Sequence, residues 1–250
     1  MNMTAVSSLA RRSFLSRLGA AAAAAGATLA ASAPAAHAQT PSDGRWQPAR
    51  HSADDWFDQL PGKHRFFFDT STPDALADAI GFAGNYYSAN KSGYGLENAD
   101  LAVVICMRHR SAPFAFNDAM WAKYGVPLAA RAEFTDPKTK EAPKVNFYTP
   151  VAPTAAATPA TSGASATPGA SAAPARARGL ANLITLGVQF AICDLSTHAI
   201  AGLLARASGG TADAVYKEIT ANLIDRARLV PAGIVAVNRA QEHGYSITGS

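Results

Sequence analysis

Leu101-Ala102-Val103-Val104-Ile105-Cys106-Met107 is a run of seven apolar residues with no polar interruption. A strand that shows no polar alternation is covered on both faces, which is typical of a central strand in a parallel sheet. Shorter apolar runs occur earlier in the chain at Arg65–Phe68 and later at Val188–Cys193. We therefore expect these three segments to be strands of one sheet.

Helical patterns separate the expected strands. The hydroxyls of Thr70–Thr72 can cap, and Pro73 can begin, a helix that we expect to reach about Asn90. Its apolar residues recur at i+3 and i+4 spacing and lie on one face: Leu76, Ala79, Ile80, Ala83 and Tyr87. Further helices are expected at 117–124, 180–186, 194–207, 211–226 and 232–242, a weak strand or extended segment at 145–148, and short strands at 229–230 and 245–247. This alternation predicts an α/β fold with an open, mostly parallel five-stranded sheet and helices on both faces.

The first forty residues are typical of an export signal. Arg11-Arg12-Ser13-Phe14-Leu15 is similar to the twin-arginine motif, and the apolar run Leu18–Ala33 ends before Ala36-His37-Ala38, a small-x-small cleavage pattern. The alternative is a membrane anchor, but the run is short and rich in Ala and Gly, whereas a span needs ~20 strongly apolar residues. We expect cleavage before Gln39 and a periplasmic mature protein with no membrane span.

The composition excludes several classes of protein. The chain has 22 Lys and Arg against 18 Asp and Glu, and three of the basic residues lie in the leader, which leaves 19 against 18. This near-neutral balance, without a cluster of Lys and Arg, argues against a nucleic-acid partner. Two cysteines cannot replace a hydrophobic core in 250 residues, so a small disulfide-stapled scaffold is excluded.

We divide the chain into a leader (1–38), an N-terminal arm (39–62) with room for one short helix, and a single α/β domain (63–250). Residues 150–177 interrupt that domain with Ala, Thr, Pro, Ser and Gly, and no large apolar side chain follows Val151. Such a segment cannot bury enough surface to offset its ordering entropy. We expect it to be a disordered, removable insertion in a loop.

Ligands of an open α/β sheet bind at the carboxyl ends of its strands, which makes Cys193 the sharpest candidate for chemistry. It ends an expected strand where a helix begins, and unpaired backbone N–H groups at a helix start favour a thiolate, the reactive form of cysteine. The alternative is that Cys193 is a small buried hydrophobic residue, as most free cysteines are. Both interpretations stay open at this point.

Cys106 lies inside its strand, where we expect it to contribute packing only. In an oxidising compartment a disulfide between Cys106 and Cys193 is a second possibility. Strands that are not neighbours would, however, hold the two Cα atoms beyond the ~7 Å limit.

Four further residues lie near the expected strand ends. Asp194 supplies cap chemistry for the helix after Cys193, together with Ser196, and His198 could face either the site or the core. Arg108 and His109 could place a cation beside an anionic substrate or a thiolate, and the alternative for both is a solvated loop. No CxxC, HExxH, haem or phosphate-loop pattern is present, so no metal or cofactor is predicted from spacing.

Five segments taken together resemble the DsrE/DsrF-like family: Lys63–Asp69, Ala89–Tyr94, Leu101–Arg108, Gly187–Cys193 and Val230–Ala236. The resemblance runs from about His64 to the C-terminus, apart from the insertion. It implies a flavodoxin-like sheet and assembly into trimers or hexamers. Well-characterised members pass sulfur as a cysteine persulfide on a thiol that follows an apolar strand, as Cys193 does here.

Two hypotheses follow. In the first, the protein is an exported DsrE-like domain in which Cys193 accepts or carries sulfane sulfur from a small donor or a partner protein thiol, supported by Asp194, His198, Arg108 and His109. In the second, it is a noncatalytic periplasmic binding or assembly module and Cys193 is structural.

Overall fold

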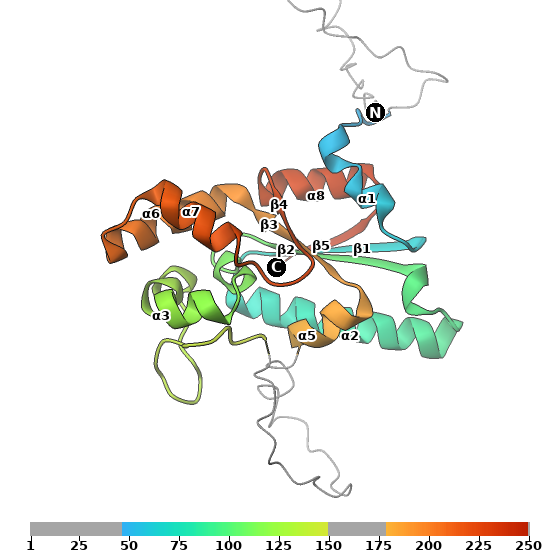
Figure 1. Ribbon diagram of the computed structural model, residues 1–250. Coiled ribbons are helices and arrows are strands. Elements are labelled where there is room, and N and C mark those ends of the chain that lie inside the picture. The colour runs from blue at the N-terminus through green and yellow to red at the C-terminus, as the bar shows by residue number, and fades with distance from the viewer. Residues whose placement is uncertain (1–46, 150–178, 250) are drawn as a thin grey trace, which may run out of the picture. The chain divides into compact units, whose positions relative to one another are not determined.

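The computed structural model describes residues 47–149 and 179–249, shown in colour in Figure 1. The expected signal peptide at 1–38, the first residues of the arm and the insertion at 150–177 lie outside the described residues. The chain divides into two units, Met1–Gln47 and Pro48–Ser250, and the second is described below. None of the helices within 47–149 and 179–249 is both long enough and apolar enough to span a membrane.

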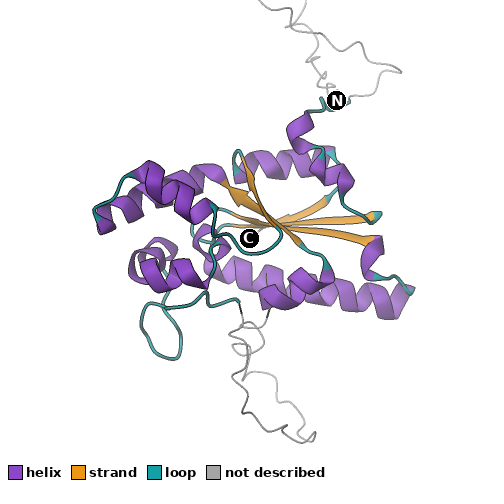
Figure 2. Cartoon of the chain, in the orientation of Figure 1, coloured by secondary structure: helices purple, strands orange, loops and turns teal. Residues whose placement is uncertain are grey.

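Five parallel strands form an open sheet, which confirms the expected α/β fold (Figure 2). The strands are β1 (His64–Thr70), β2 (Leu101–Met107), β3 (Gln189–Cys193), β4 (Ala227–Val230) and β5 (Ser246–Gly249). Their order across the sheet is β4-β3-β2-β1-β5. All seven residues of β2 are buried, as its uninterrupted apolar sequence predicts for a central strand.

The strand order determines which helices cover which face. The chain moves in one direction from β1 to β4, so right-handed crossovers place the helices between them on one face. These helices are α2 (Pro73–Tyr94), α3 (Asp118–Ala132), α5 (Gly179–Leu186), α6 (Asp194–Ser208) and α7 (Ala212–Thr220). The return from β4 to β5 runs the other way and places α8 (Gly233–Glu242) on the opposite face, where α1 (Trp56–Gln59) also packs (Figure 1).

Each face of the sheet has its own hydrophobic core. Side chains alternate along a strand, so Ile105 and Met107 of β2 join the cluster under α2, α3, α5, α6 and α7. Val104 and Cys106 point the other way, into the cluster under α1 and α8. The second core includes Trp56 and Phe57, so the described end of the expected arm is part of the packed domain.

The first long helix matches its sequence pattern. The Thr72 side chain accepts a hydrogen bond from the Ala75 N–H, and Pro73 is the first helical residue. All five residues of the predicted stripe are buried. The helix continues to Tyr94, past the expected end, because Gly95 adopts the left-handed conformation (φ 67°) that terminates it.

Three local expectations are wrong. Helix α3 continues to Ala132 instead of ending at Tyr124, with non-helical backbone at Tyr124 and Pro127 inside the helix. Helix α7 ends at Thr220 instead of Arg226. Residues 145–148 form a turn and no strand, since the buried Asn146 side chain donates to the carbonyls of Phe114 and Phe116 and ties the segment to the loop after β2.

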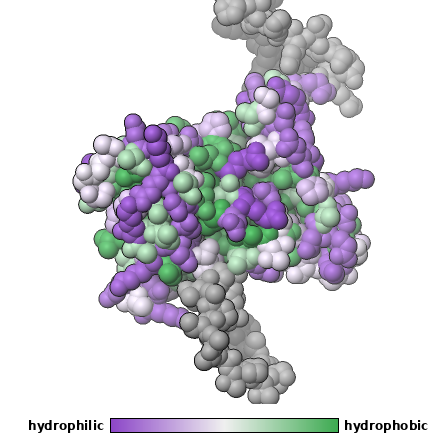
Figure 3. All heavy atoms as spheres, in the orientation of Figure 1, coloured by the Kyte–Doolittle hydropathy of each residue, from purple (hydrophilic) through white to green (hydrophobic). Residues whose placement is uncertain are grey.

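Apolar residues gather toward the middle of the face shown in Figure 3, with hydrophilic residues around them.

A cavity of about 470 Å³ is lined by Ile184, Leu223 and Ile224 together with Asp118 and Asp225. None of the predicted site residues lines it. The cavity therefore does not bear on the chemistry predicted for Cys193.

Candidate thiol site at the carboxyl edge of the sheet

Cys193 is the last residue of β3 and the N-cap of α6, so its predicted place at a strand-to-helix junction is confirmed. It lies opposite Val230 of β4, and only 6% of its surface is exposed. Its carbonyl accepts a hydrogen bond from the Thr197 hydroxyl at 3.0 Å. The expectation that Asp194 and Ser196 cap this helix is wrong, because α6 begins at Asp194 and has no side-chain cap.

The second thiol lies on the same face of the sheet. Cys106 of β2 pairs with Ala191 of β3, two residues before Cys193, and side chains at that spacing point the same way. Cys106 is fully buried. Burial raises the pKa of the Cys106 thiol well above its ordinary value, and the neighbouring Asp69 and Cys193 raise this pKa further. Cys106 is therefore held as a neutral thiol.

The expectation of non-neighbouring strands for the two cysteines is also wrong, because β2 and β3 are adjacent in the sheet. Cys106 and Cys193 are instead diagonal neighbours, a relation that places Cα atoms about 7–8 Å apart in a sheet. A disulfide needs a separation below ~7 Å, so linking them would require backbone movement. Both cysteines are free in the structure.

Arg108 follows β2 and is held by Asp69 of β1. Its Nε donates to Oδ1 of Asp69 at 2.8 Å and its Nη2 donates to Oδ2 at 2.7 Å, which is a bidentate pair. The hydrogen bonds to Asp69 raise the pKa of Arg108, and the two cysteines also contribute to this shift. Arg108 directly follows Met107, which pairs with Ile192, the residue before Cys193, so this permanent cation lies at the same strand ends as Cys193.

Helix α8 closes the site from above the sheet. A Cβ at Gly233, its first residue, would lie 2.6 Å from Cδ and 2.8 Å from Cβ of Arg108, and 3.1 Å from Sγ of Cys106. Glycine is therefore required for this close approach. The N-cap of α8 is Ala232, which offers no capping side chain.

His198 and Asp194 form a separate cluster with Tyr216 of α7. The His198 ring stacks on Tyr216 with centroids 4.0 Å apart, and its Nε2 lies 3.6 Å from Asp194 Oδ2. The Tyr216 hydroxyl donates to Asp194 Oδ1 at 2.7 Å, and this hydrogen bond raises the pKa of Tyr216. These contacts engage the His198 ring and the Asp194 carboxylate with α7.

His109 contributes through its backbone. It adopts the left-handed conformation (φ 54°), and its N–H donates to the Ser196 hydroxyl of α6 at 3.0 Å. The loop after β2 is thereby fastened to the first turn of α6. These contacts involve the backbone of His109, and the role of its side chain as a cation beside the thiol stays a prediction.

Sequence reasoning placed Asp69 at the end of the first expected strand but assigned it no role, and it did not include Gly233 among the site residues. Asp69 follows an apolar run, which is a signal available in the sequence, but its partner could be identified only once β1 and β2 were known to be neighbours. Gly233 gives no local signal, because its importance depends on how closely α8 approaches Arg108.

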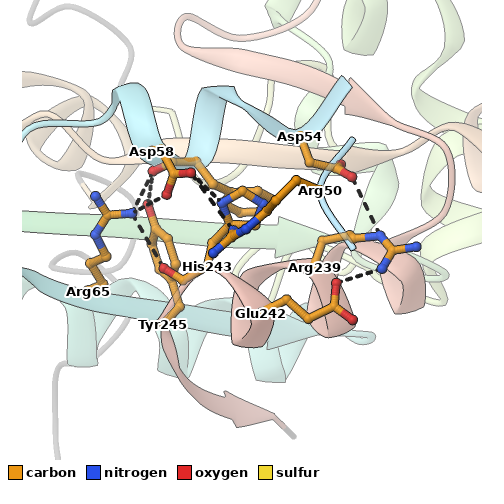
Figure 4. Close-up of polar contacts among 9 residues, drawn as sticks. Arg50, Asp54, Asp58, Arg65, Arg239, Glu242, His243 and Tyr245 are labelled. Atoms are coloured by element: carbon orange, nitrogen blue, oxygen red, sulfur yellow. Dashed lines mark hydrogen bonds and ion pairs between the residues drawn. The ribbon is translucent and has the colours of Figure 1, made fainter. Parts of the chain in front are cut away.

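A second polar cluster lies at the other end of α8 (Figure 4). Asp58, just C-terminal to Trp56 and Phe57, pairs with Nδ1 of the buried His243 at 2.9 Å and with Arg65 at 3.2 Å. The close contact with His243 lowers the pKa of Asp58, and the charges of His243, Arg50 and Arg65 act in the same direction. This cluster fastens α1 to α8 and β1.

Within the part of the chain that the structure describes, no three His, Cys, Asp or Glu side chains are grouped so that they could hold a metal ion. Family models and curated proteins give no match to the chain. Among solved structures, it is similar to a protein of unknown function, MTH1491 from Methanobacterium thermoautotrophicum. The two share 12% identity and a TM-score of 0.35, over 75% of this chain and 100% of that one. The assignment of the site therefore comes from its own geometry.

Proposed function

We propose that the protein accepts sulfane sulfur on Cys193 and carries it as a persulfide. The observation that carries the proposal is the position of Cys193 at the N-cap of α6, with the Arg108 cation at the end of the neighbouring strand β2. A helix N-terminus and a nearby cation both favour the thiolate, which is the nucleophile. The resemblance to the DsrE/DsrF-like family supports the same chemistry.

The reaction is a thiol exchange at sulfur. The Cys193 thiolate attacks the outer sulfur of a donor persulfide, and a new sulfur–sulfur bond forms at Sγ of Cys193 as the donor bond breaks. The donor leaves as a thiolate with the bonding electron pair, so no external oxidant is needed. A later acceptor thiolate takes the outer sulfur by the same exchange and returns Cys193 to its thiolate.

Two exposed apolar side chains lie in the first turns of the helices that adjoin the thiol site. Leu195 in the first turn of α6 is 67% exposed, and Ile234 in the first turn of α8 is 63% exposed. We propose that a partner protein or a small sulfur donor approaches Cys193 between these two turns.

Mass spectrometry tests the proposal. The purified protein is incubated with a low-molecular-weight persulfide and then with a thiol reductant, and its intact mass is measured at each step. We expect a reversible gain of one sulfur atom that maps to Cys193. The Cys193→Ser variant should lose this gain, and the Cys106→Ser variant should keep it, since Cys106 is fully buried and held as a neutral thiol.

The exposure of Cys193 favours one alternative. At 6% exposure the residue also fits a packing role in a noncatalytic binding or assembly module. In that case treatment with the persulfide leaves the mass of the wild type and of both cysteine variants unchanged, and Cys193→Ser alters only the stability of the protein. A folded protein whose Cys193 stays unmodified by the persulfide would contradict the sulfur-carrier proposal.

We further propose export by the twin-arginine route and assembly into trimers or hexamers. The support is the Arg11-Arg12 motif with its apolar run, and the family resemblance. Replacing both arginines by lysine should retain the full-length precursor in the cytoplasm, whereas export of this variant would contradict the proposed route. Light scattering of the mature protein measures the assembly, and a monomer would contradict the oligomer proposal.

A further inference from the structure

Arg108 is confined on two sides at the thiol site. On the β1 side, two hydrogen bonds of 2.8 and 2.7 Å fix its guanidinium to Asp69, whose side chain is only 12% exposed. On the α8 side, Gly233 packs against the Arg108 stem with no room for a Cβ. A bidentate pair restricts a planar guanidinium in orientation as well as in position.

Asp69 also faces one of the two thiols directly. It lies opposite Cys106 in the register of β1 with β2. The charged or titratable groups near the thiol site are Cys106 of β2, Arg108 after it, Asp69 of β1 and Asp194 of α6. Arg228 of β4 lies opposite Ala191, and its guanidinium lies over the Trp56 ring, 5.0 Å from the ring centroid. Val230 of β4 and Gly233 of α8, which also adjoin the two thiols, carry no titratable side chain.

We propose that Asp69 is a positioning residue for the chemistry of Cys193, acting by holding the Arg108 guanidinium beside the sulfur. This inference rests on the proposed function for its biological meaning, but it concerns the thiol itself. Without Asp69, the long Arg108 side chain is free to extend into solvent, and the thiolate loses its fixed cation.

Asp69 could influence the Cys193 thiol in two ways, and these have opposite effects on how easily the thiol ionises. A carboxylate near a thiol disfavours the thiolate through space, so removing it would make Cys193 easier to ionise. A carboxylate that positions a cation favours the thiolate, so removing it would make Cys193 harder to ionise. The sign of the change in Asp69→Ala therefore decides between positioning and direct repulsion.

The experiment measures thiolate formation in the full chain against pH, by ultraviolet thiolate absorbance and by the rate of alkylation with iodoacetamide. The Cys193→Ser profile is subtracted, so that only Cys193 is followed. The variants are Asp69→Ala, Arg108→Ala, the double variant and Asp69→Glu. Glu97→Ala is the control, because it removes an exposed ion pair with Lys91 and lies before the first residue of β2, at the opposite end of this strand from Arg108.

We expect Asp69→Ala and Arg108→Ala to move the midpoint of thiolate formation to higher pH and to slow alkylation near neutrality by about fivefold to tenfold. The double variant should shift the midpoint and slow alkylation no more than either single variant does, because both substitutions remove the same ion pair. Asp69→Glu, which keeps a carboxylate for the guanidinium, should restore part of the rate, and Glu97→Ala should have no effect.

A midpoint that falls in Asp69→Ala, or that does not move, overturns the proposal, and so do additive effects in the double variant. If Asp69→Ala does not fold, Asp69→Asn provides the same test, since it keeps one acceptor and should give a smaller shift in the same direction. Because the assay uses no sulfur donor, failure of persulfide loading in the wild type would refute the proposed function and leave this result standing.

Discussion

Arg108 and Asp69 join the carboxyl ends of the two central strands β2 and β1 through two parallel hydrogen bonds, at 2.8 and 2.7 Å. Their side chains are 31% and 12% exposed, so the pair is partly shielded from water. It lies on the face of the sheet that α8 covers, beside both cysteines. The pair therefore connects the packing of α8 with the electrostatics of the thiol site.

The first prediction concerns the contact between α8 and this pair. Gly233→Ala should lower the free energy of unfolding by about 1–3 kcal/mol, because the new methyl group would overlap the Arg108 stem and approach Cys106 Sγ. Urea unfolding measures the change. Gly81→Ala in α2 is the matched control, since no atom lies within 4 Å of a Cβ there and alanine should be neutral or stabilising. Equal stability of the two variants would contradict the close contact at Gly233.

The second prediction concerns oxidation of the two thiols. Incubation with oxidised glutathione should leave Cys106 and Cys193 without a disulfide between them, because their diagonal register needs backbone movement and burial holds Cys106 as a neutral thiol. Peptide mapping under non-reducing conditions detects the linkage. Rapid formation of this disulfide with an unchanged fold would refute the register described for β2 and β3.

The third prediction concerns alkaline pH. Burial raises the pKa of Tyr87 and of Tyr245 to about 12, from an ordinary value of 10.0. Because the unfolded chain ionises first, the stability from these two groups is fully present below pH 10 and is lost as pH rises toward 12, by roughly 2 kcal/mol for each tyrosine.

Measuring the unfolding of tyrosine variants between pH 10 and pH 12 tests this prediction. In Tyr245→Phe the decline in free energy should be shallower, although the variant also loses the hydrogen bond from the Tyr245 hydroxyl to the Phe57 carbonyl. Tyr94→Phe is the control, because Tyr94 is 80% exposed. An identical decline in Tyr245→Phe and the wild type would mean that Tyr245 is not buried as described.

The fourth prediction concerns the attachment of α1. The pKa of Asp58 lies below its ordinary value of 3.8 because of its close contact with His243, so its contribution to stability is present above pH 3.8 and is lost as pH falls further. Because the Asp58 side chain is 54% exposed, the contribution should stay below about 1 kcal/mol.

Asp58→Asn should therefore be slightly less stable than the wild type near neutral pH, and the difference should shrink as pH falls below 3.8. Urea unfolding across that range provides the comparison. Asp213→Asn, which changes an exposed acid in the first turn of α7, is the control. A constant difference at every pH would show that the Asp58 charge does not contribute.

Local sequence patterns were sufficient for the central elements. The unbroken apolar run Leu101–Met107 could be recognised as a strand covered on both faces, and it is fully buried. The Thr72 cap, Pro73 and the apolar stripe predicted α2, because capping and 3.6-residue periodicity are properties of neighbouring residues. The same reasoning placed Cys193 at a strand-to-helix junction.

Strand order, register and the approach of α8 were decided only by the tertiary structure. Cys106 adjoins Cys193 because β2 pairs with β3, and Arg108 meets Asp69 because β1 pairs with β2, although 39 positions separate that second pair. The local pattern left the direction of His198 open, and it is the position of Tyr216 on α7 that holds its ring against α7. Periodicity in a sequence reports which face of an element is apolar, whereas the choice of partner depends on how all the faces pack together.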